Sequence, residues 1–226
     1  MDLELVRKER RKNIRMQDLT DSTVNLDGYA EPRFVEVKEA FIGNFEKHQE
    51  LGAAVAVYHR GQLVVDLAAG LRDRDSGIPY TRDSLQPVFS VSKGITALVA
   101  NMLIDRGQIE LDAPVAYYWP EFAQANKSEI PVRWLRTHQC GVIGIDRKIS
   151  LEQLLDWSLV VELLAAQAAD WAPGTKHGNH AITYGFLVGE VVRRVTGLTV
   201  GQHVDREIAR PLAAELCIGS HDEKGD

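Results

Sequence analysis

Ser90 and Lys93 are the residues whose types and spacing most directly suggest chemistry. They lie three positions apart where a helical pattern begins, so one helical turn would bring the hydroxyl and the amine together. A serine hydroxyl is a weak nucleophile at neutral pH, and a partly desolvated lysine can supply the base or cation that it needs. The pair predicts an activated serine nucleophile. The alternative is that Ser90 only caps a helix and Lys93 is solvated.

Apolar periodicity predicts the elements that would position this pair. Residues 90–107 form the helix that begins with it, since apolar side chains recur there at helical spacing. A helix is expected over 33–50, followed by a hairpin of strands at 52–58 and 63–70. Further helices are expected over residues 132–137, 150–157, 182–196 and 200–210. Early strands followed by helices indicate an α+β fold rather than a doubly wound parallel sheet.

Composition and charge narrow the class of protein. A chain of 226 residues can bury a substantial core, and its formal net charge of −6 argues against general affinity for nucleic acid or anionic membranes. Residues 1–18 are highly charged and lack the apolar stretch of a secretory signal. The two cysteines do not make a disulfide framework. We therefore expect a cytoplasmic protein, with a polar leader at 1–27 and a folded domain at 28–226.

Family landmarks occur in a fixed order along the chain: Phe89–Gly94, Gln108–Val115, Val132–Gly141, and Trp171–Thr175 with Tyr184–Gly189. The first contains the Ser-x-x-Lys signature of penicillin-binding proteins and serine β-lactamases. Together they resemble the serine β-lactamase-like hydrolases, especially the class C-like group that includes family VIII carboxylesterases. The resemblance covers roughly residues 34–219. It implies a β-lactamase/penicillin-binding-protein-like fold, in which helices flank an antiparallel sheet and residues 107–181 form a mostly helical subregion.

The resemblance assigns roles to individual residues. Ser90 would be acylated, and Lys93 would take or share its proton. The family's general-base tyrosine falls at Asn179, and a carboxamide cannot take a proton at neutral pH. Either His177 or His180 could supply a base instead. If Asn179 replaces the base, acyl transfer should be slow or absent.

Other residues are candidates for contact with substrate. His180 and Trp119 are predicted to bind substrate, although a tryptophan in such a position is more often part of the core. A Cys140–His138 dyad is rejected, because the matching family segment uses this histidine in packing. His177 and His180 have no carboxylate or cysteine nearby to complete a metal set. No metal or cofactor is therefore expected.

The late strand that carries the family's Lys-Thr-Gly, His-x-Gly or Trp-x-Gly triplet is not found in this sequence. We therefore expect the domain to lack the family's C-terminal strands, as a fragment or as a chain completed by another chain or a homo-oligomer. The predicted function is a carboxylesterase that cleaves short-chain esters through a Ser90 acyl-enzyme. A β-lactamase or D-amino-acid peptidase acting on an amide, or a catalytically impaired binding protein, are the alternatives.

Overall fold

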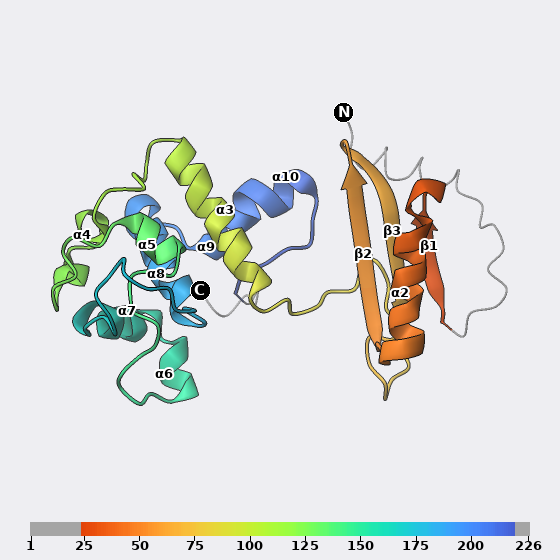
Figure 1. Ribbon diagram of the computed structural model, residues 1–226, viewed down its shortest axis with the longest axis horizontal. Coiled ribbons are helices and arrows are strands. Elements are labelled where there is room, and N and C mark those ends of the chain that lie inside the picture. Colours follow the sequence, from red (N-terminus) through yellow and green to blue (C-terminus); the bar gives the residue numbers. More distant parts are fainter. Residues whose placement is uncertain (1–23, 220–226) are drawn as a thin grey trace. The chain divides into compact units, whose positions relative to one another are not determined.

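The computed structural model describes residues 24–219, which divide into a sheet-containing unit up to Gln86 and a helical unit from Pro87 onward. Each unit is shown in Figure 1 and is described here by itself. Most of the predicted leader, 1–27, lies outside the described residues. Its last two positions belong to a strand that begins at Leu26, because their backbone pairs with that of a neighbouring strand. The strand β1 therefore includes the last two residues of the predicted leader.

The first unit is a three-stranded antiparallel sheet in the order β1-β3-β2. The strands are β1 (Leu26–Ala30), β2 (Gly52–His59) and β3 (Gln62–Gly70). The predicted hairpin is confirmed, and β1 adds the third strand on the other edge of β3. As the central strand, β3 is the most buried of the three, which its apolar sequence explains.

Helix α2 (Val35–His48) packs on this sheet after a short 3₁₀ turn, η1 (Pro32–Phe34). Figure 1 shows the helix running alongside the strands. It contributes Phe41 to a small core, and Phe45 packs at its margin. The other buried members of that core all come from β3: Val64, Val65, Leu67 and Ala69. The sheet is therefore covered by the helix that the sequence predicts.

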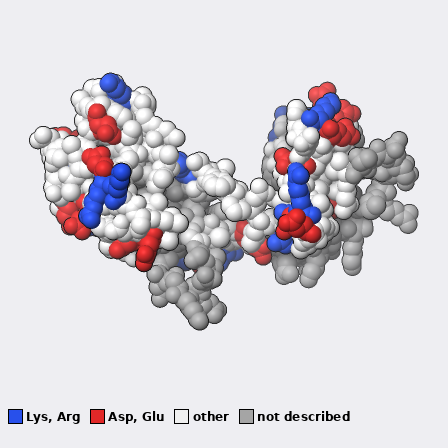
Figure 2. Space-filling view, turned by 90° about the horizontal axis from the view of Figure 1, so that it is seen from below, with Lys and Arg blue, Asp and Glu red and all other residues white. Residues whose placement is uncertain are grey.

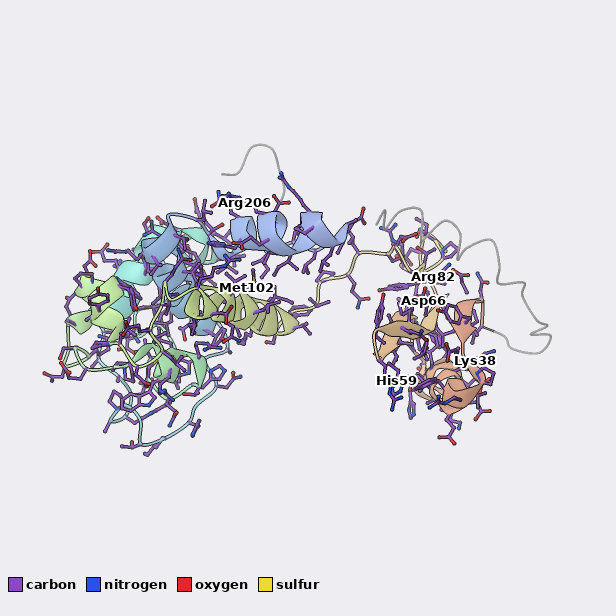
Figure 3. All side chains as sticks on the ribbon, turned by 90° about the horizontal axis from the view of Figure 1, so that it is seen from above. Lys38, His59, Asp66, Arg82, Met102 and Arg206 are labelled. Atoms are coloured by element: carbon purple, nitrogen blue, oxygen red, sulfur yellow. The ribbon has the colours of Figure 1, made fainter. Side chains whose placement is uncertain are left out.

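Polar contacts fasten the loop that follows β3. Arg82 binds Asp66 of β3 at 2.9 Å and Asp27 of β1 at 3.1 Å, and Figure 3 shows Arg82 beside Asp66. Gly28 allows the two strands to approach each other, because a Cβ atom there would overlap the carbonyl oxygen of Asp66. The backbone of Gly28 also has φ +109°, which side chains rarely adopt.

The second unit is helical, and its core is built from three longer helices. These are α3 (Val91–Asp105), α7 (Trp157–Ala166) and α8 (Thr183–Thr196). Their apolar faces pack together, with α3 and α7 both against α8. The shorter helices are α4 (Val115–Tyr118), η2 (Pro120–Ala123), α5 (Val132–Arg136), α6 (Leu151–Leu155), α9 (Val200–Val204), the π-helical η3 (Asp205–Ala209) and α10 (Arg210–Leu212). None of the helices in residues 24–219 is long and apolar enough to cross a membrane.

The helical region differs from the prediction in one element. The helices α3 and α8, which the sequence predicts over 90–107 and 182–196, lie in the same unit as the predicted subregion of 107–181. The sequence analysis missed α7. Asp156 ends α6 and caps α7, because its carboxylate accepts a hydrogen bond from the Leu159 N–H at 3.1 Å. One expected helix thus becomes two.

Two buried charged side chains fasten α7. Lys127 has no exposed surface, and its ammonium donates to the carbonyl oxygens of Gln124, Ala165 and Gln167. The last two lie at the C-terminal end of α7, where carbonyls lack helical partners. Glu190 of α8 is equally buried and accepts a hydrogen bond from Trp157 Nε1 at 2.8 Å. These contacts hold α7 against the rest of the core.

Candidate active site

Ser90 lies at the N-terminal end of α3 with its hydroxyl outside the helix capping network. Its side chain makes no capping hydrogen bond, which contradicts the alternative that it only caps the helix. Within residues 24–219 no group accepts a hydrogen bond from the Ser90 N–H. Phe89, just before it, has φ +46° and is 87% exposed. Such a backbone conformation is costly for a residue with a side chain, and strained residues of this kind cluster at functional sites.

Lys93 contacts Ser90 as the helical spacing predicts. Its Nζ donates a hydrogen bond to Ser90 Oγ at 3.0 Å and another to the carbonyl oxygen of Ala181 at 2.7 Å. The hydroxyl of Ser92, the other serine in the motif, is engaged differently and donates to the carbonyl of Phe89 at 2.7 Å. Ser90 is therefore the serine whose oxygen lies against the lysine.

The chain that carries Asn179 is fixed on both sides of that residue. The Gly178 N–H donates to the carbonyl of His138 at 3.1 Å, and the His180 N–H donates to His138 Nδ1 at 3.2 Å. A Cβ atom at Gly178 would overlap the Trp171 ring, so the backbone also lies directly on that indole. These contacts fix the segment that leads to Ala181 and to the Lys93 amine.

Asn179 itself is exposed, and its side chain has no hydrogen-bond partner among the described residues. It stands two positions before Ala181, whose carbonyl contacts Lys93. A carboxamide in this place can donate and accept hydrogen bonds but cannot take a proton at neutral pH. The loss of the general base at position 179 therefore stays a prediction, and the exposure of Asn179 is compatible with it.

His180 lies in the interior, with both ring nitrogens occupied by the protein. The Gly178 carbonyl can only accept, so Nδ1 carries the proton and donates to it at 2.7 Å. Nε2 then accepts from the Cys140 thiol, with Sγ 3.0 Å away. Because the ring is fully buried, direct contact with substrate, as predicted for His180, is contradicted. Burial also lowers its pKa, which opposes a role as a charged group.

Cys140 is equally unsuited to nucleophilic chemistry. Burial raises the pKa of its thiol to about 11, so the thiolate that a cysteine nucleophile requires is not formed near neutral pH. Its S–H is used as a donor to His180. The rejected Cys–His dyad therefore has no support in the geometry either, because the histidine that contacts Cys140 is His180 rather than His138.

Trp119 lies in the core. It is 1% exposed, and its ring packs on Phe122 with centroids 5.1 Å apart. Burial leaves no indole surface for a ligand, so the prediction that Trp119 binds substrate is corrected to a packing role. The apolar sequence around it is the signal that favoured this role from the start.

A family model described as Beta-lactamase matches residues 37–221 of the chain, which include every residue of this site. The chain belongs to the beta-lactamase family. Esterase/beta-lactamase LipL of Mycobacterium tuberculosis is 40% identical over 195 residues, which cover 86% of this chain and 45% of LipL. Esterase EstB of Burkholderia gladioli is 32% identical over 186 residues, covering 74% of this chain and 46% of EstB. The chain spans about half the length of the curated relatives it matches.

Solved structures of the beta-lactamase family confirm the predicted α+β fold class. A penicillin-binding protein homologue from Caulobacter crescentus superposes with a TM-score of 0.84 at 38% identity, covering 88% of this chain and 53% of that chain. A family VIII carboxylesterase superposes with a TM-score of 0.79 at 39% identity, covering 83% of this chain and 51% of the carboxylesterase chain. The relatives include esterases and β-lactamases, so membership of the family supports a hydrolase.

His138 is the site residue whose contacts the sequence analysis missed. Its pKa is lowered by burial first, and then by the positive charge of Lys93 and by His177, so the ring is neutral near neutral pH. The motif Thr137–Cys140 signalled only that the residue packs. Its bond to the His180 N–H joins positions 42 residues apart, which no local pattern reveals.

Charge around the helical unit is mixed. On the face shown in Figure 2, acidic and basic side chains of the described residues lie near one another rather than in separate regions. Within residues 24–219, no group of three or more His, Cys, Asp and Glu side chains could hold a metal ion.

Proposed function

We propose that this chain carries the nucleophile of a serine esterase that cleaves short-chain esters, with Ser90 as the acylated residue. The observation that supports this most is the hydrogen bond between Lys93 Nζ and Ser90 Oγ at 3.0 Å, at an exposed helix N-terminus. A neighbouring amine can take or share the hydroxyl proton as the serine oxygen attacks. The name of EstB favours an ester substrate, and the name of LipL includes both esterase and beta-lactamase.

The proposed reaction has two steps. In the first, Ser90 Oγ forms a bond to the ester carbonyl carbon, the alcohol leaves with the hydroxyl proton, and an acyl-serine remains. The Ser90 N–H, which has no acceptor among the described residues, and the positive end of the α3 dipole would stabilise the developing oxyanion. In the second step, water cleaves the acyl-serine, and the acid leaves. Lys93 passes the serine proton to the leaving alcohol in the first step, and it passes a proton from water to Ser90 Oγ in the second.

A second candidate function follows from Asn179. In this candidate Lys93 serves only the first step, and the base that activates water in the second step is missing, because the carboxamide of Asn179 cannot act as one. A protein with this residue would form the acyl-serine but release it slowly, so it would act as a covalent binder of esters or amides rather than as a rapid hydrolase. The exposure of Asn179 and its lack of a hydrogen-bond partner within the described residues favour this candidate.

Covalent labelling tests the proposal directly. A fluorescent fluorophosphonate would phosphonylate a working nucleophile, forming a P–O bond to Ser90 as fluoride leaves. We expect labelling of the wild type, with the adduct on the peptide that contains Ser90, and none of Ser90→Ala. Absence of labelling in the wild type would rule out the nucleophile. A fluorescent penicillin and a p-nitrophenyl ester, used in parallel, compare amide with ester substrates.

Release of the acyl group separates the two candidates. Rapid turnover of p-nitrophenyl acetate, linear from the start, supports the esterase. A burst of one equivalent of p-nitrophenol followed by very slow release supports the covalent binder. Mass spectrometry of the intact protein during the reaction shows directly whether the acetyl group remains on the chain.

A further inference from the structure

His138 makes contacts on both sides of residue 179. Its carbonyl accepts the Gly178 N–H at 3.1 Å, and its ring Nδ1 accepts the His180 N–H at 3.2 Å. The residue between these two bonds is Asn179, whose backbone is thereby held in place while its side chain faces solvent. A single histidine thus fixes the course of the chain at the position where the family is expected to carry its base.

The same segment controls the lysine. One residue after His180, the Ala181 carbonyl accepts a hydrogen bond from Lys93 Nζ at 2.7 Å. The Lys93 amine is thus held between this carbonyl and Ser90 Oγ. A shift of the 178–181 segment would therefore move one of the two acceptors that orient the amine.

The ring of His138 is itself held firmly. It packs against Tyr184 of α8, with centroids 5.1 Å apart, and against the His180 ring at 5.3 Å. Its backbone has φ +61°, a conformation that is costly for a residue with a side chain. The tertiary contacts that compensate for this cost are those that place Nδ1 against the 178–180 backbone.

We propose that His138 is a positioning residue for the reaction at Ser90: it clamps residues 178–180 and so sets where the side chain at 179 and the Ala181 carbonyl lie relative to Lys93. This inference rests on the proposed function, since it concerns the same acyl transfer. His138 acts through the backbone and through Lys93 and does not itself touch the substrate.

The clamp requires a neutral His138. Because Nδ1 accepts the His180 N–H, the ring proton lies on Nε2. Protonation would place an N–H on Nδ1, directly facing another N–H, and the bond would be lost. The titratable and charged groups that surround the ring are Lys93 from α3, His177 and His180 from the preceding loop, and Tyr184 from α8. Burial, and then the charges of Lys93 and His177, keep the pKa of His138 below the ordinary 6.5, so the bond to the His180 N–H is kept near neutral pH.

Two substitutions separate the hydrogen bond from the backbone strain. His138→Asn keeps an acceptor, because Oδ1 of asparagine occupies the place of Nδ1, and asparagine tolerates positive φ. His138→Gly also tolerates positive φ but has no acceptor. If both variants react more slowly at Ser90, the packing of the His138 ring is what matters. If only His138→Gly reacts more slowly and His138→Asn reacts like the wild type, the hydrogen bond to the His180 N–H is what matters. Circular dichroism checks that both variants are folded.

The first measurement is the rate of phosphonylation of Ser90 by the fluorophosphonate. We expect a decrease of about tenfold or more in His138→Gly, as for other small displacements of a reacting group, and near wild-type labelling in His138→Asn. The wild-type rate should also fall in acid, at a pH lower than the ordinary histidine pKa of 6.5, because the pKa of His138 is lowered and the ring becomes protonated only there. The labelling rate of His138→Asn should not show the decrease that protonation of His138 causes in the wild type. Equal labelling of wild type and His138→Gly would overturn the inference.

The second measurement does not depend on activity. Hydrogen exchange of the His180 amide, followed by NMR, should be slow in the wild type and in His138→Asn and faster in His138→Gly. Unchanged exchange in His138→Gly would show that His138 does not clamp the segment. If the wild type is not labelled at Ser90, the proposed function fails, and the exchange data still decide whether the clamp exists.

Discussion

Lys93 Nζ lies 2.7 Å from the carbonyl oxygen of Ala181, a residue 88 positions later in the chain. This contact ties the N-terminal end of α3 to the segment that enters α8. The same amine contacts Ser90 Oγ, so the nucleophile and the 178–181 segment share one hydrogen-bond donor. The predictions that follow test this connection and the core that supports it.

Replacing Lys93 should remove the reactivity of Ser90. Lys93→Met keeps the length and the apolar stem of the side chain but removes both hydrogen bonds of the amine. We expect fluorophosphonate labelling to fall by about 100-fold or more, because a positioned proton acceptor contributes on that order. The thermal midpoint should change little. Labelling at the wild-type rate would show that the lysine does not assist the serine.

Restoring a phenol at position 179 should speed release of the acyl group. In Asn179→Tyr, a hydroxyl able to exchange a proton would stand at an exposed position next to the Lys93 segment. The steady-state rate with p-nitrophenyl acetate should rise by about 100-fold. Asn179→Phe is the matched control, since it adds the ring without the hydroxyl. Equal rates in the two variants would place the defect elsewhere.

Gly178→Ala should displace the segment that carries Asn179. The added methyl group would overlap the Trp171 ring and approach Ile143, so the backbone must move. We expect slower labelling of Ser90 and a loss of about 1–3 kcal/mol in unfolding free energy, as for other overpacked sites. Gly185→Ala is the control, because open space surrounds that position in α8 and alanine favours a helix. Chemical denaturation measures the unfolding free energy of both variants.

Lys127→Met should destabilise the helical unit. The change removes the donor that satisfies the carbonyls of Ala165 and Gln167 at the end of α7, and those carbonyls stay buried. The loss should be about 2–4 kcal/mol in unfolding free energy, which is the cost of leaving buried polar groups unpaired. Lys148→Met, at an exposed position, should be nearly neutral. A stable Lys127→Met variant would mean that water replaces the ammonium.

Protonation of Glu207 should contribute to the loss of stability in acid. Hydrogen bonds from Arg106 and then from His203 lower its pKa from the ordinary 4.5 to about 2. A carboxyl with a lowered folded-state pKa contributes stability that is complete above 4.5 and is lost as the pH falls toward 2. The unfolding free energy of Glu207→Gln should therefore converge with that of the wild type in this window. Chemical denaturation of both proteins at a series of pH values measures this.

The helical contact between Ser90 and Lys93 was predictable from sequence because it is local. A spacing of three residues at the start of a helix brings the two side chains together whatever the rest of the fold does. The hairpin of β2 and β3 was predictable for the same reason, since its strands are adjacent in sequence. The strand β1 was missed, because it is only five residues long and it pairs with β3 through contacts that are distant in the sequence.

The candidate site shows the same division. The replacement expected at Asn179 and the family to which the chain belongs could be predicted from ordered motifs along the sequence. The burial of His180 and Trp119 could not be predicted, because either an interior or a surface position is compatible with these polar or amphipathic side chains.

The sequence by itself determined the nucleophile motif, the α+β class and the absence of a tyrosine at position 179. Only the tertiary structure decided which backbone carbonyl holds Lys93 and which imidazole holds the 178–180 segment. The physical reason is distance along the chain, because the bonds from Lys93 to Ala181 and from His180 to His138 span 88 and 42 positions. Such contacts depend on how α3, α5 and α8 pack around their shared core.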